Sequence, residues 1–356
     1  MGKKKKVCMV VQNPMVKGGI AAVVNGYRNS ILEQEFNIRY VESYKDGRKF
    51  TKLLKAIVGY LHFAKLLLLE KIELVHIHSS FGPSFYRKLF FIYMAHWFNK
   101  PVINHCHGAD FDSFYLNASH RKKRMIEKTY NKCTMVIALS DEWKERLSMI
   151  VSPAKIIVIE NYSTIHEDAI KYKVKKEMNQ QILFLGEIGQ RKGCYDIPDV
   201  VEKVVEKFPD AKFVLGGSGD IDQIKSLLIK KGIEKNVLFT GWVRGQEKDK
   251  LLRESDIFFL PSYNEGMPMA ILDAMGYGLP IVSTLVGGIP KIVKEGKNGY
   301  LCKPGNTQEL SDALIKLLND ESACKRYSNS SGEIVKQKYS LEKHINQLIK
   351  LYKNNF

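Results

Sequence analysis

Residues 256–284 read DIFFLPSYNEGMPMAILDAMGYGLPIVST, and this stretch contains the pattern that decides the fold. An apolar run leads into a short polar loop, then a segment of helical spacing between Pro268 and Gly278, then a second apolar run. Proline suits the first turn of a helix, and glycine suits its carboxyl end. The stretch therefore predicts two parallel strands joined by a helix, which is the repeating unit of a doubly wound sheet.

The same alternation of apolar runs and helix-length segments extends along the whole chain. The predicted strands lie at 6–11, 36–41, 73–78, 101–107, 134–140, 156–161, 181–186, 211–217, 236–241, 256–262, 279–284 and 298–302. Strands that alternate with helices indicate an α/β fold with parallel sheets. We therefore predict two Rossmann-like doubly wound domains in tandem, with a ligand site in a cleft at the carboxyl ends of their strands.

The chain length of 356 residues also favours two domains, because it exceeds the usual size of a single hydrophobic core. Residues 162–180 interrupt the apolar rhythm with charged and amide side chains, which predicts an interdomain linker there. The predicted domains are 1–165 and 166–340. A helix at 341–356 is expected to pack back on the first domain.

The net charge of +17 is distributed unevenly between the two halves. Residues 1–165 contain 26 basic and 13 acidic residues, whereas the remainder contains 29 and 25. A basic domain points to an anionic partner, which can be nucleic acid, an acidic membrane surface or a phosphorylated substrate, although simple solvation is an alternative.

Several features bear on the location of the protein and on metal binding. The most apolar stretches, 66–69 and 89–98, are too short to span a bilayer, so no transmembrane segment is predicted. Six cysteines without a CxxC pair indicate reduced thiols in a cytoplasmic compartment. The HCH at 105–107 lacks the spacing of a closed zinc site, and no metal site is predicted.

The second half carries the stronger signs of a ligand site. Several of its strands end in glycine, which allows close backbone approach to a ligand, and these glycines include Gly186 and Gly217. Glu265 lies in the loop before the predicted helix and Asp273 lies within it. The amino end of that helix suits a diphosphate, whereas carboxylates suit sugar hydroxyls. Arg191 and Lys192 can offset charge on a leaving diphosphate, or they can be ordinary solvated loop charges.

The first half offers weaker candidates. Gly18 and Gly19 follow the first strand and precede a helix, an arrangement that suits phosphate but also occurs in plain turns. His107 ends a predicted strand, where a histidine is more often structural than functional. His76 and His78 alternate on one strand, so one of them is expected to line an acceptor pocket unless both are buried.

The combined motifs resemble glycosyltransferase family 4, whose members are retaining enzymes of the GT-B fold. The resemblance rests on PSYNEGMPMAILDAMGYGLPIVST, with two acids separated by seven residues, and on KGG at 17–19, HGAD at 107–110, LGEIGQRKG at 185–193, GGSGD at 216–220, VGGIP at 286–290 and NGYL at 298–301. It covers nearly the whole chain, and the combination is highly specific.

The resemblance implies roles for particular residues. Glu265 would hold the donor sugar, Asp273 the ribose hydroxyls, and Arg191 with Lys192 the diphosphate. His107 would contact the donor sugar. The turn at Gly266, Met267 and Pro268 would lie beside the sugar and phosphates, and the loop at Gly18 and Gly19 would reach the donor phosphate or the acceptor. From the residues themselves, the strand ends at Gly186 and Gly217 are expected to contact the donor, and Trp242 and Val243 are expected to border the base.

Two departures from the family pattern affect this assignment. The second acid is usually glutamate and here is the shorter Asp273. Many relatives have arginine directly after the strand glycine, where this chain has Glu187. The second departure leaves open which basic residue grips the β-phosphate.

The predicted function is retaining transfer of a hexosyl unit from a nucleotide-diphosphate sugar, expected to be UDP-linked. The expected acceptor is a lipid-linked glycan of a cell-surface polysaccharide, with the enzyme peripheral on the anionic inner face of the membrane and independent of metal. Helical segments at 49–65 and 87–100 mix basic and apolar residues, as interfacial helices do, but their apolar faces can equally pack on the sheet.

Two alternatives are a GT-B-like sugar-nucleotide epimerase or phosphorylase, and a basic nucleic-acid-binding protein. The second is disfavoured because the basic residues are dispersed and no RNA-binding or recognition-helix motif is present.

Overall fold

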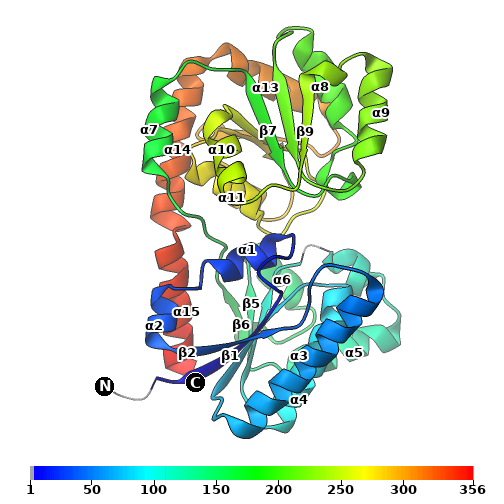
Figure 1. Cartoon of the computed structure of the whole chain (residues 1–356), viewed down its shortest axis with the longest axis vertical. Helices are drawn as coiled ribbons and strands as arrows, with labels where there is room; N and C mark the ends of the chain where they lie inside the picture. Colours follow the sequence, from blue (N-terminus) through cyan, green and yellow to red (C-terminus); the bar gives the residue numbers. More distant parts are fainter. Residues whose placement is uncertain (1–3, 109, 356) are drawn as a thin grey trace. The chain divides into compact units, whose positions relative to one another are not determined.

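The computed structural model describes residues 4–108 and 110–355, and it divides the chain into two compact units. The first unit comprises Met1–Asn161 and Leu341–Phe356, and the second comprises Tyr162–Ser340. Each unit contains a parallel sheet of six strands flanked by helices (Figure 1). The prediction of an α/β fold with two doubly wound sheets is confirmed.

The first sheet has the strand order β2-β1-β3-β4-β5-β6. Its central strand β3 is buried along its whole length, as expected for a parallel strand covered on both faces. The strands are β1 (Lys6–Val11), β2 (Asn37–Glu42), β3 (Leu74–Ser79), β4 (Val102–Cys106), β5 (Met135–Ala138) and β6 (Ile156–Val158).

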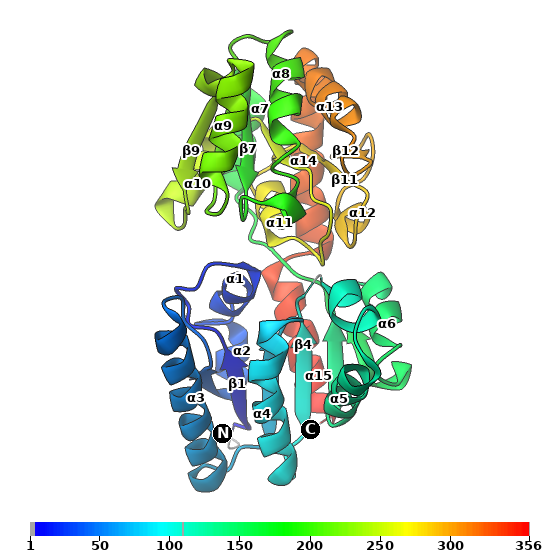
Figure 2. The ribbon, with the colours of Figure 1, turned by 90° about the vertical axis from the view of Figure 1, so that its right-hand side faces the viewer.

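Helices cover both faces of this sheet (Figure 2). One face packs against α3 (Lys49–Leu69), α4 (Pro83–Trp97), α5 (His120–Asn131) and α6 (Asp141–Leu147), whose apolar residues share one core with the strands. Right-handed crossovers place α1 (Gly19–Asn25) and α2 (Ile31–Glu35) on the other face. The C-terminal helix α15 (Leu341–Asn355) packs on α2 and therefore belongs to the first unit.

The second sheet has the order β12-β11-β10-β7-β8-β9. Its strands are β7 (Gln181–Leu185), β8 (Lys212–Gly216), β9 (Val237–Gly241), β10 (Ile257–Leu260), β11 (Ile281–Thr284) and β12 (Gly299–Cys302). Strands β7 and β10 are hydrogen-bonded neighbours, although more than seventy residues separate them in sequence. The loops that follow these two strands therefore meet at the same edge of the sheet.

The helices of the second unit also form two layers. In one layer α8 (Ile197–Val205) contacts α9 (Ile221–Lys231) and α13 (Thr307–Asn319). In the other α14 (Glu321–Lys338) contacts α7 (Glu167–Lys175) and α11 (Met269–Gly276), and α13 also contacts α14, which follows it in the chain. The helix α10 (Gln246–Glu254) contacts β7, and the short α12 (Ile289–Ile292) contacts β11.

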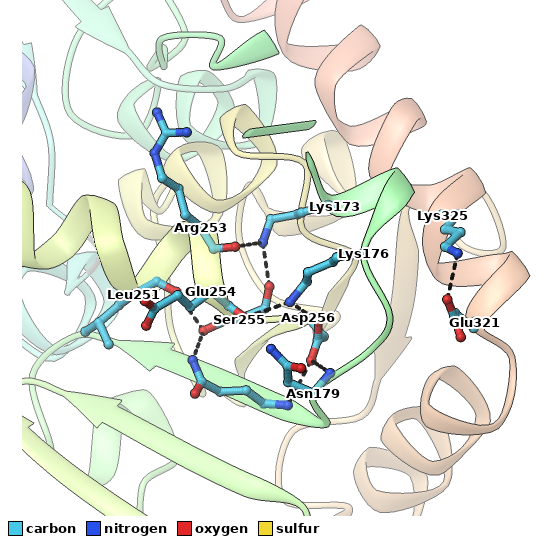
Figure 3. A network of polar contacts seen from close by, with 11 residues as sticks. Lys173, Lys176, Asn179, Leu251, Arg253, Glu254, Ser255, Asp256, Glu321 and Lys325 are labelled. Carbon is cyan, nitrogen blue, oxygen red and sulfur yellow. Dashed lines mark hydrogen bonds and ion pairs between the residues drawn. The ribbon is translucent and has the colours of Figure 1, made fainter. Parts of the chain in front are cut away.

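The predicted linker at 162–180 is wrong, because most of it is an integral part of the second unit. Helix α7 lies within it, and the side chain of Lys173 is buried at the amino ends of the strands. Lys173 donates hydrogen bonds to the carbonyl oxygens of Arg253 and Ser255 at 2.9 and 2.5 Å, and Lys176 pairs with Asp256 at 2.6 Å (Figure 3). These bonds attach α7 and the residue that follows it to the sheet. The polar composition of the segment does not indicate this attachment.

Candidate functional site

The loops after β7 and β10 form a charged cluster at the carboxyl edge of the second sheet. The first loop ends in a short helical turn, η3 (Gln190–Lys192), and the second contains Glu265. The backbone amide of Tyr263 donates to the carbonyl oxygen of Arg191 at 2.9 Å, which fastens the two loops together. Their approach requires glycine at position 193, where φ is +70° and an added Cβ would lie 1.9 Å from the carbonyl oxygen of Pro261.

Glu265 is the centre of this cluster. Its residue is only 5% exposed, and one carboxylate oxygen accepts from Lys192 Nζ at 2.5 Å and from Ser262 Oγ at 2.7 Å. The guanidinium of Arg191 lies farther away, at 3.8 Å from the other oxygen. A buried carboxylate needs such partners, because loss of hydration would otherwise be costly. The cluster therefore contains two cations and one buried anion, which leaves positive charge available to an anionic ligand.

Arg191 is also anchored by the loop around it. Its Nη1 donates to the carbonyl oxygen of Asn264 at 3.2 Å, and its Nη2 lies 3.7 Å from a carboxylate oxygen of Glu187. Glu187, which directly follows the strand glycine Gly186, thus engages the neighbouring basic residue. Its side chain is 71% exposed, so this ion pair is weak and can be exchanged for another anion.

Asp273 lies within α11 and makes two contacts that sequence reasoning missed. Ser163 Oγ donates to one of its oxygens at 3.0 Å, and Lys248 Nζ contacts the other. Lys248 belongs to α10, and Ser163 precedes α7, so neither residue is close to Asp273 in sequence. No local pattern could have identified them. Each carboxylate oxygen retains capacity for a second hydrogen bond, and hydroxyl groups can supply it.

The turn before α11 is close to the predicted form. The sequence predicts Pro268 in the first turn of α11, and in the structure Pro268 is the N-cap, one position before that turn. Gly278 follows the helix with φ of +74°. The amide of Gly288 donates to the carbonyl oxygen of Gly266 at 2.7 Å, so the VGGIP segment supports this turn. Met267 is 3% exposed, and it anchors the turn in the core.

The glycines at the ends of β7 and β8 pack on each other. A Cβ on Gly217 would lie 1.8 Å from the carbonyl oxygen of Gly186, so these loops are closely packed. After β9, Trp242 is half-buried and Val243 is buried beside Gly216. The role predicted for these residues beside the base remains a prediction.

The first unit holds the remaining candidates. Gly18 is the N-cap of α1 with φ +129°, and Gly19 opens that helix. His107 follows β4, and its Nε2 lies 2.9 Å from Nδ1 of His78. This hydrogen bond fixes the ring of His107 and leaves its Nδ1 for other partners.

Five histidines form a cluster on one face of the first sheet: His76, His78, His105, His107 and His344. Loss of hydration lowers the pKa of His76 and of His107 to about 3, and that of His344 to about 4. Burial likewise holds the pKa values of His78 and His105 well below the ordinary range. These rings are therefore neutral at pH 7. His76 and His78 are both fully buried, so neither lines an acceptor pocket.

The ligand atoms of His76, His78 and His105 lie within 4.8 Å of one another, and imidazole is a common zinc ligand. The rings of His76 and His78 stack with centroids 4.4 Å apart, however, and the planes of His76 and His105 differ by only 7°. Lone pairs lie in the ring planes, so this stacking does not aim them at one point. We assign no metal to this cluster.

Asp112 forms an ion pair with Arg146, whose Nη1 lies 3.0 and 3.2 Å from the two carboxylate oxygens. All six cysteines are free and buried. No helix in the described ranges is both long enough and apolar enough to cross a membrane.

Two family models match the chain. Residues 166–334 match the family described as Glycosyl transferases group 1, and residues 22–162 match Glycosyltransferase Family 4. Together they cover most of both units.

Individual similar proteins are also glycosyltransferases or share the fold. An uncharacterised glycosyltransferase of Methanocaldococcus jannaschii is 29% identical over 63% of this chain, which spans 61% of that protein's length. The UDP-Gal:alpha-D-GlcNAc-diphosphoundecaprenol alpha-1,3-galactosyltransferase of Escherichia coli is 27% identical over 84% of this chain and 80% of its own length. Among solved structures, sucrose-phosphate synthase from Thermosynechococcus elongatus has a TM-score of 0.82 over 98% of both chains at 16% identity, which shows a shared fold.

Proposed function

Because the chain belongs to glycosyltransferase family 4 and is therefore a glycosyltransferase, we propose that it moves a hexosyl unit from a nucleotide-diphosphate sugar to a glycan acceptor. The anomeric configuration of the sugar is retained. The observation that carries this proposal is the buried carboxylate of Glu265, held 2.5 Å from the ammonium of Lys192 with Arg191 beside it. Such a cluster offers an acceptor for sugar hydroxyls next to donors for a diphosphate.

Each charged residue has a distinct role in the donor complex. Glu265 accepts hydrogen bonds from hydroxyls of the hexose, while Asp273 accepts from the ribose hydroxyls. Arg191 and Lys192 neutralise the diphosphate, and the amide groups at the start of α11 assist them. Met267 and Pro268 fix the shape of the turn that presents these amides, and Ser262 orients Glu265. That His107 contacts the sugar stays a prediction.

The reaction proceeds by attack on the face from which the diphosphate departs. The bond between the anomeric carbon and the phosphate oxygen breaks, and a bond from the acceptor oxygen to the same carbon forms. The proton of the acceptor hydroxyl passes to the leaving phosphate oxygen. Negative charge grows on the diphosphate in the transition state, and preorganised donors such as Arg191 and Lys192 stabilise it.

The two basic residues supply the charge that a divalent cation would otherwise provide. We therefore expect transfer to be independent of metal. Full activity in excess EDTA is the predicted result, and a loss that Mg²⁺ or Mn²⁺ restores would contradict it.

The proposed donor is UDP-linked, and the proposed acceptor is a lipid-linked glycan of a cell-surface polysaccharide. The relative from Escherichia coli supports both choices, because its name specifies UDP-Gal and a diphosphoundecaprenol-linked acceptor. The excess of basic residues in the first half supports an anionic acceptor, since a diphosphate-linked lipid carries negative charge.

We further propose that the first unit contacts the anionic inner face of the cell membrane. Helix α3 exposes a row of large apolar side chains, among them Phe50 at 74%, Leu53 at 60% and Leu61 at 67%. Water-exposed apolar rows of this size indicate an interaction site, and neighbouring lysines favour an anionic surface. Because these side chains are exposed, the apolar residues of α3 do not all pack on the sheet.

A thermal-shift panel of nucleoside diphosphates and their sugars tests the donor assignment, because a ligand that binds the folded state raises the melting temperature. UDP and UDP-hexoses are expected to stabilise the chain more than GDP or ADP compounds. Release of UDP should require an acceptor, which separates a transferase from an epimerase. Stabilisation by GDP alone would contradict the UDP assignment, and no response to any nucleotide would contradict the donor site.

A further inference from the structure

An open basin of about 1040 Å³ lies in the first unit, between α4, α5 and the starts of β5 and β6. It is at the amino edge of the sheet, whereas the candidate residues Gly18 and His107 follow the carboxyl ends of their strands. The proposed chemistry therefore makes no use of this basin.

The walls of the basin are strongly basic. Four of the lining residues, Arg124, Lys128, Lys132 and Lys155, carry permanent positive charge, and Glu127 is the one acid among them. The carboxylate of Glu127 accepts from the hydroxyl of Tyr115 at 2.7 Å. A concave surface with this excess of cations favours an anion.

Two of the cations are held in place by the protein. Lys155 Nζ donates to the carbonyl oxygens of Asn131 and Cys133 at 2.9 and 3.2 Å, and its third proton is available to a ligand. The ammonium of Lys132 lies 5.0 Å from the ring centroid of Tyr93. Arg124 and Lys128 are exposed on α5. The basin thus combines fixed and mobile positive charges.

One rim of the basin is aromatic and apolar. Tyr93 lines the basin, and its ring meets that of Trp97 edge-on at a centroid distance of 6.4 Å. Trp97 is 70% exposed, and at the corresponding end of α3 the side chains of Leu68 and Leu69 are 67% and 74% exposed. Tryptophan and tyrosine favour the interface between water and lipid. A free soluble anion has no need of such a rim.

We propose that this basin binds the phosphate of an anionic glycerophospholipid. Trp97 and the exposed leucines at the end of α3 then lie in the boundary between headgroups and acyl chains. The inference rests on the proposed membrane contact and adds a specific headgroup site to it. A nucleic acid is the less suitable occupant, because the apolar rim offers no further phosphate contacts along a strand.

Vesicle sedimentation with the full chain tests this assignment. The variant R124Q/K128Q should bind phosphatidylglycerol-rich vesicles about 30-fold more weakly than the unmodified chain, at about 5-fold for each basic residue. Its weaker binding to pure phosphatidylcholine vesicles should not change. The matched control K45Q/R121Q removes the same charge from exposed positions of the first unit that do not line the basin, and it should bind both vesicles nearly as the unmodified chain does.

The outcomes separate the two proposals. If the unmodified chain ignores both vesicles, the membrane contact and the headgroup site both fail. If the unmodified chain binds anionic vesicles but the two double variants behave alike, the headgroup site is wrong and the membrane contact stands. If R124Q/K128Q loses oligonucleotide binding but keeps its affinity for phosphatidylglycerol-rich vesicles, the lipid assignment is overturned.

Discussion

The two units bury different kinds of polar groups near the ends of their strands. In the first unit, His76, His78 and His105 are fully buried, and burial lowers their pKa values enough to keep them neutral. In the second unit, Glu265 is almost as buried but is paired with the ammonium of Lys192. The buried histidines of the first unit are polar without charge, whereas the buried carboxylate of the second unit is paired with a cation.

This difference supports our proposal that the donor binds the second unit. A departing diphosphate needs positive charge in place before the bond breaks, and neutral imidazoles do not provide it. The histidines instead form a packed cluster, in which one ring nitrogen of the half-buried His107 is fixed by His78. We therefore expect transfer activity to depend on the charges of the second unit, and the stability of the first unit to depend on its histidines being neutral.

The largest effect is expected for Glu265→Gln. Loss of the carboxylate removes a strong acceptor for the sugar and releases Lys192 from its partner, so kcat/KM for transfer should fall by about 100- to 1000-fold, or roughly 3 to 4 kcal/mol. Glu206→Gln, on an exposed residue of the same unit, is the control and should retain full activity. Near-normal turnover by a folded Glu265→Gln protein would refute the role of the carboxylate.

Acid should destabilise the first unit through its histidines. Their pKa values are lowered in the folded state, to about 3 for His76 and about 4 for His344, whereas an unfolded histidine titrates near 6.5. The unfolded chain therefore binds more protons between these values, and stability falls as pH drops from about 6.5 toward 4. The expected loss of unfolding free energy exceeds about 2 kcal/mol at pH 5.

Denaturant unfolding monitored at several pH values measures this loss. His120→Gln, at an exposed position, should leave the pH dependence unchanged, whereas His344→Gln should reduce it. A free energy of unfolding that is constant between pH 7 and pH 5 would show that the cluster is not buried as neutral rings.

A smaller effect is expected at the ribose contact. Asp273→Asn keeps the shape but removes the charge that Lys248 and Ser163 hold in place, so the dissociation constant for UDP should rise about 10-fold. Calorimetric titration with UDP and with its 2′,3′-dideoxy analogue distinguishes the cause. The variant should lose affinity for UDP but little for the analogue, and an equal loss for both ligands would remove Asp273 from ribose recognition.

The smallest effect on stability is expected on the exposed face of α3. Leu53→Ser and Leu61→Ser should each change the unfolding free energy by no more than about 0.5 kcal/mol, because both side chains are already more than half exposed. Binding to phosphatidylcholine vesicles should nevertheless decrease, as vesicle sedimentation would show. A large loss of stability would mean that this face is packed in solution.

Much of the fold could be predicted because it follows from local patterns. All twelve strands were placed near their true positions from apolar runs, and the turn from Glu265 to Pro268 followed from the residues that begin and end helices. The charged segment at 162–180 was misassigned because its lysines bond to backbone carbonyls far along the chain, at Arg253 and Ser255. Such contacts have no local signature.

The candidate site shows the same limit. Glu265, Arg191 and Lys192 could be identified as candidates from sequence, since each lies in a loop that follows a predicted strand. Their mutual pairing and the contacts of Asp273 with Lys248 and Ser163 depend on which strands are neighbours in the sheet. Sequence does not predict that His76 and His78 are buried, for a similar reason. Strand alternation predicts that both side chains lie on one face of the sheet, but it does not predict which elements cover that face.

The central claim is that Arg191 and Lys192 hold the diphosphate of the donor, and calorimetric titration of UDP against UMP tests it most directly. The unmodified chain should bind UDP more tightly than UMP, and the double variant R191Q/K192Q should lose this preference while remaining folded. Lys212→Gln, at an exposed position on the opposite edge of the second sheet, should keep it. An undiminished preference for UDP in R191Q/K192Q would contradict the account.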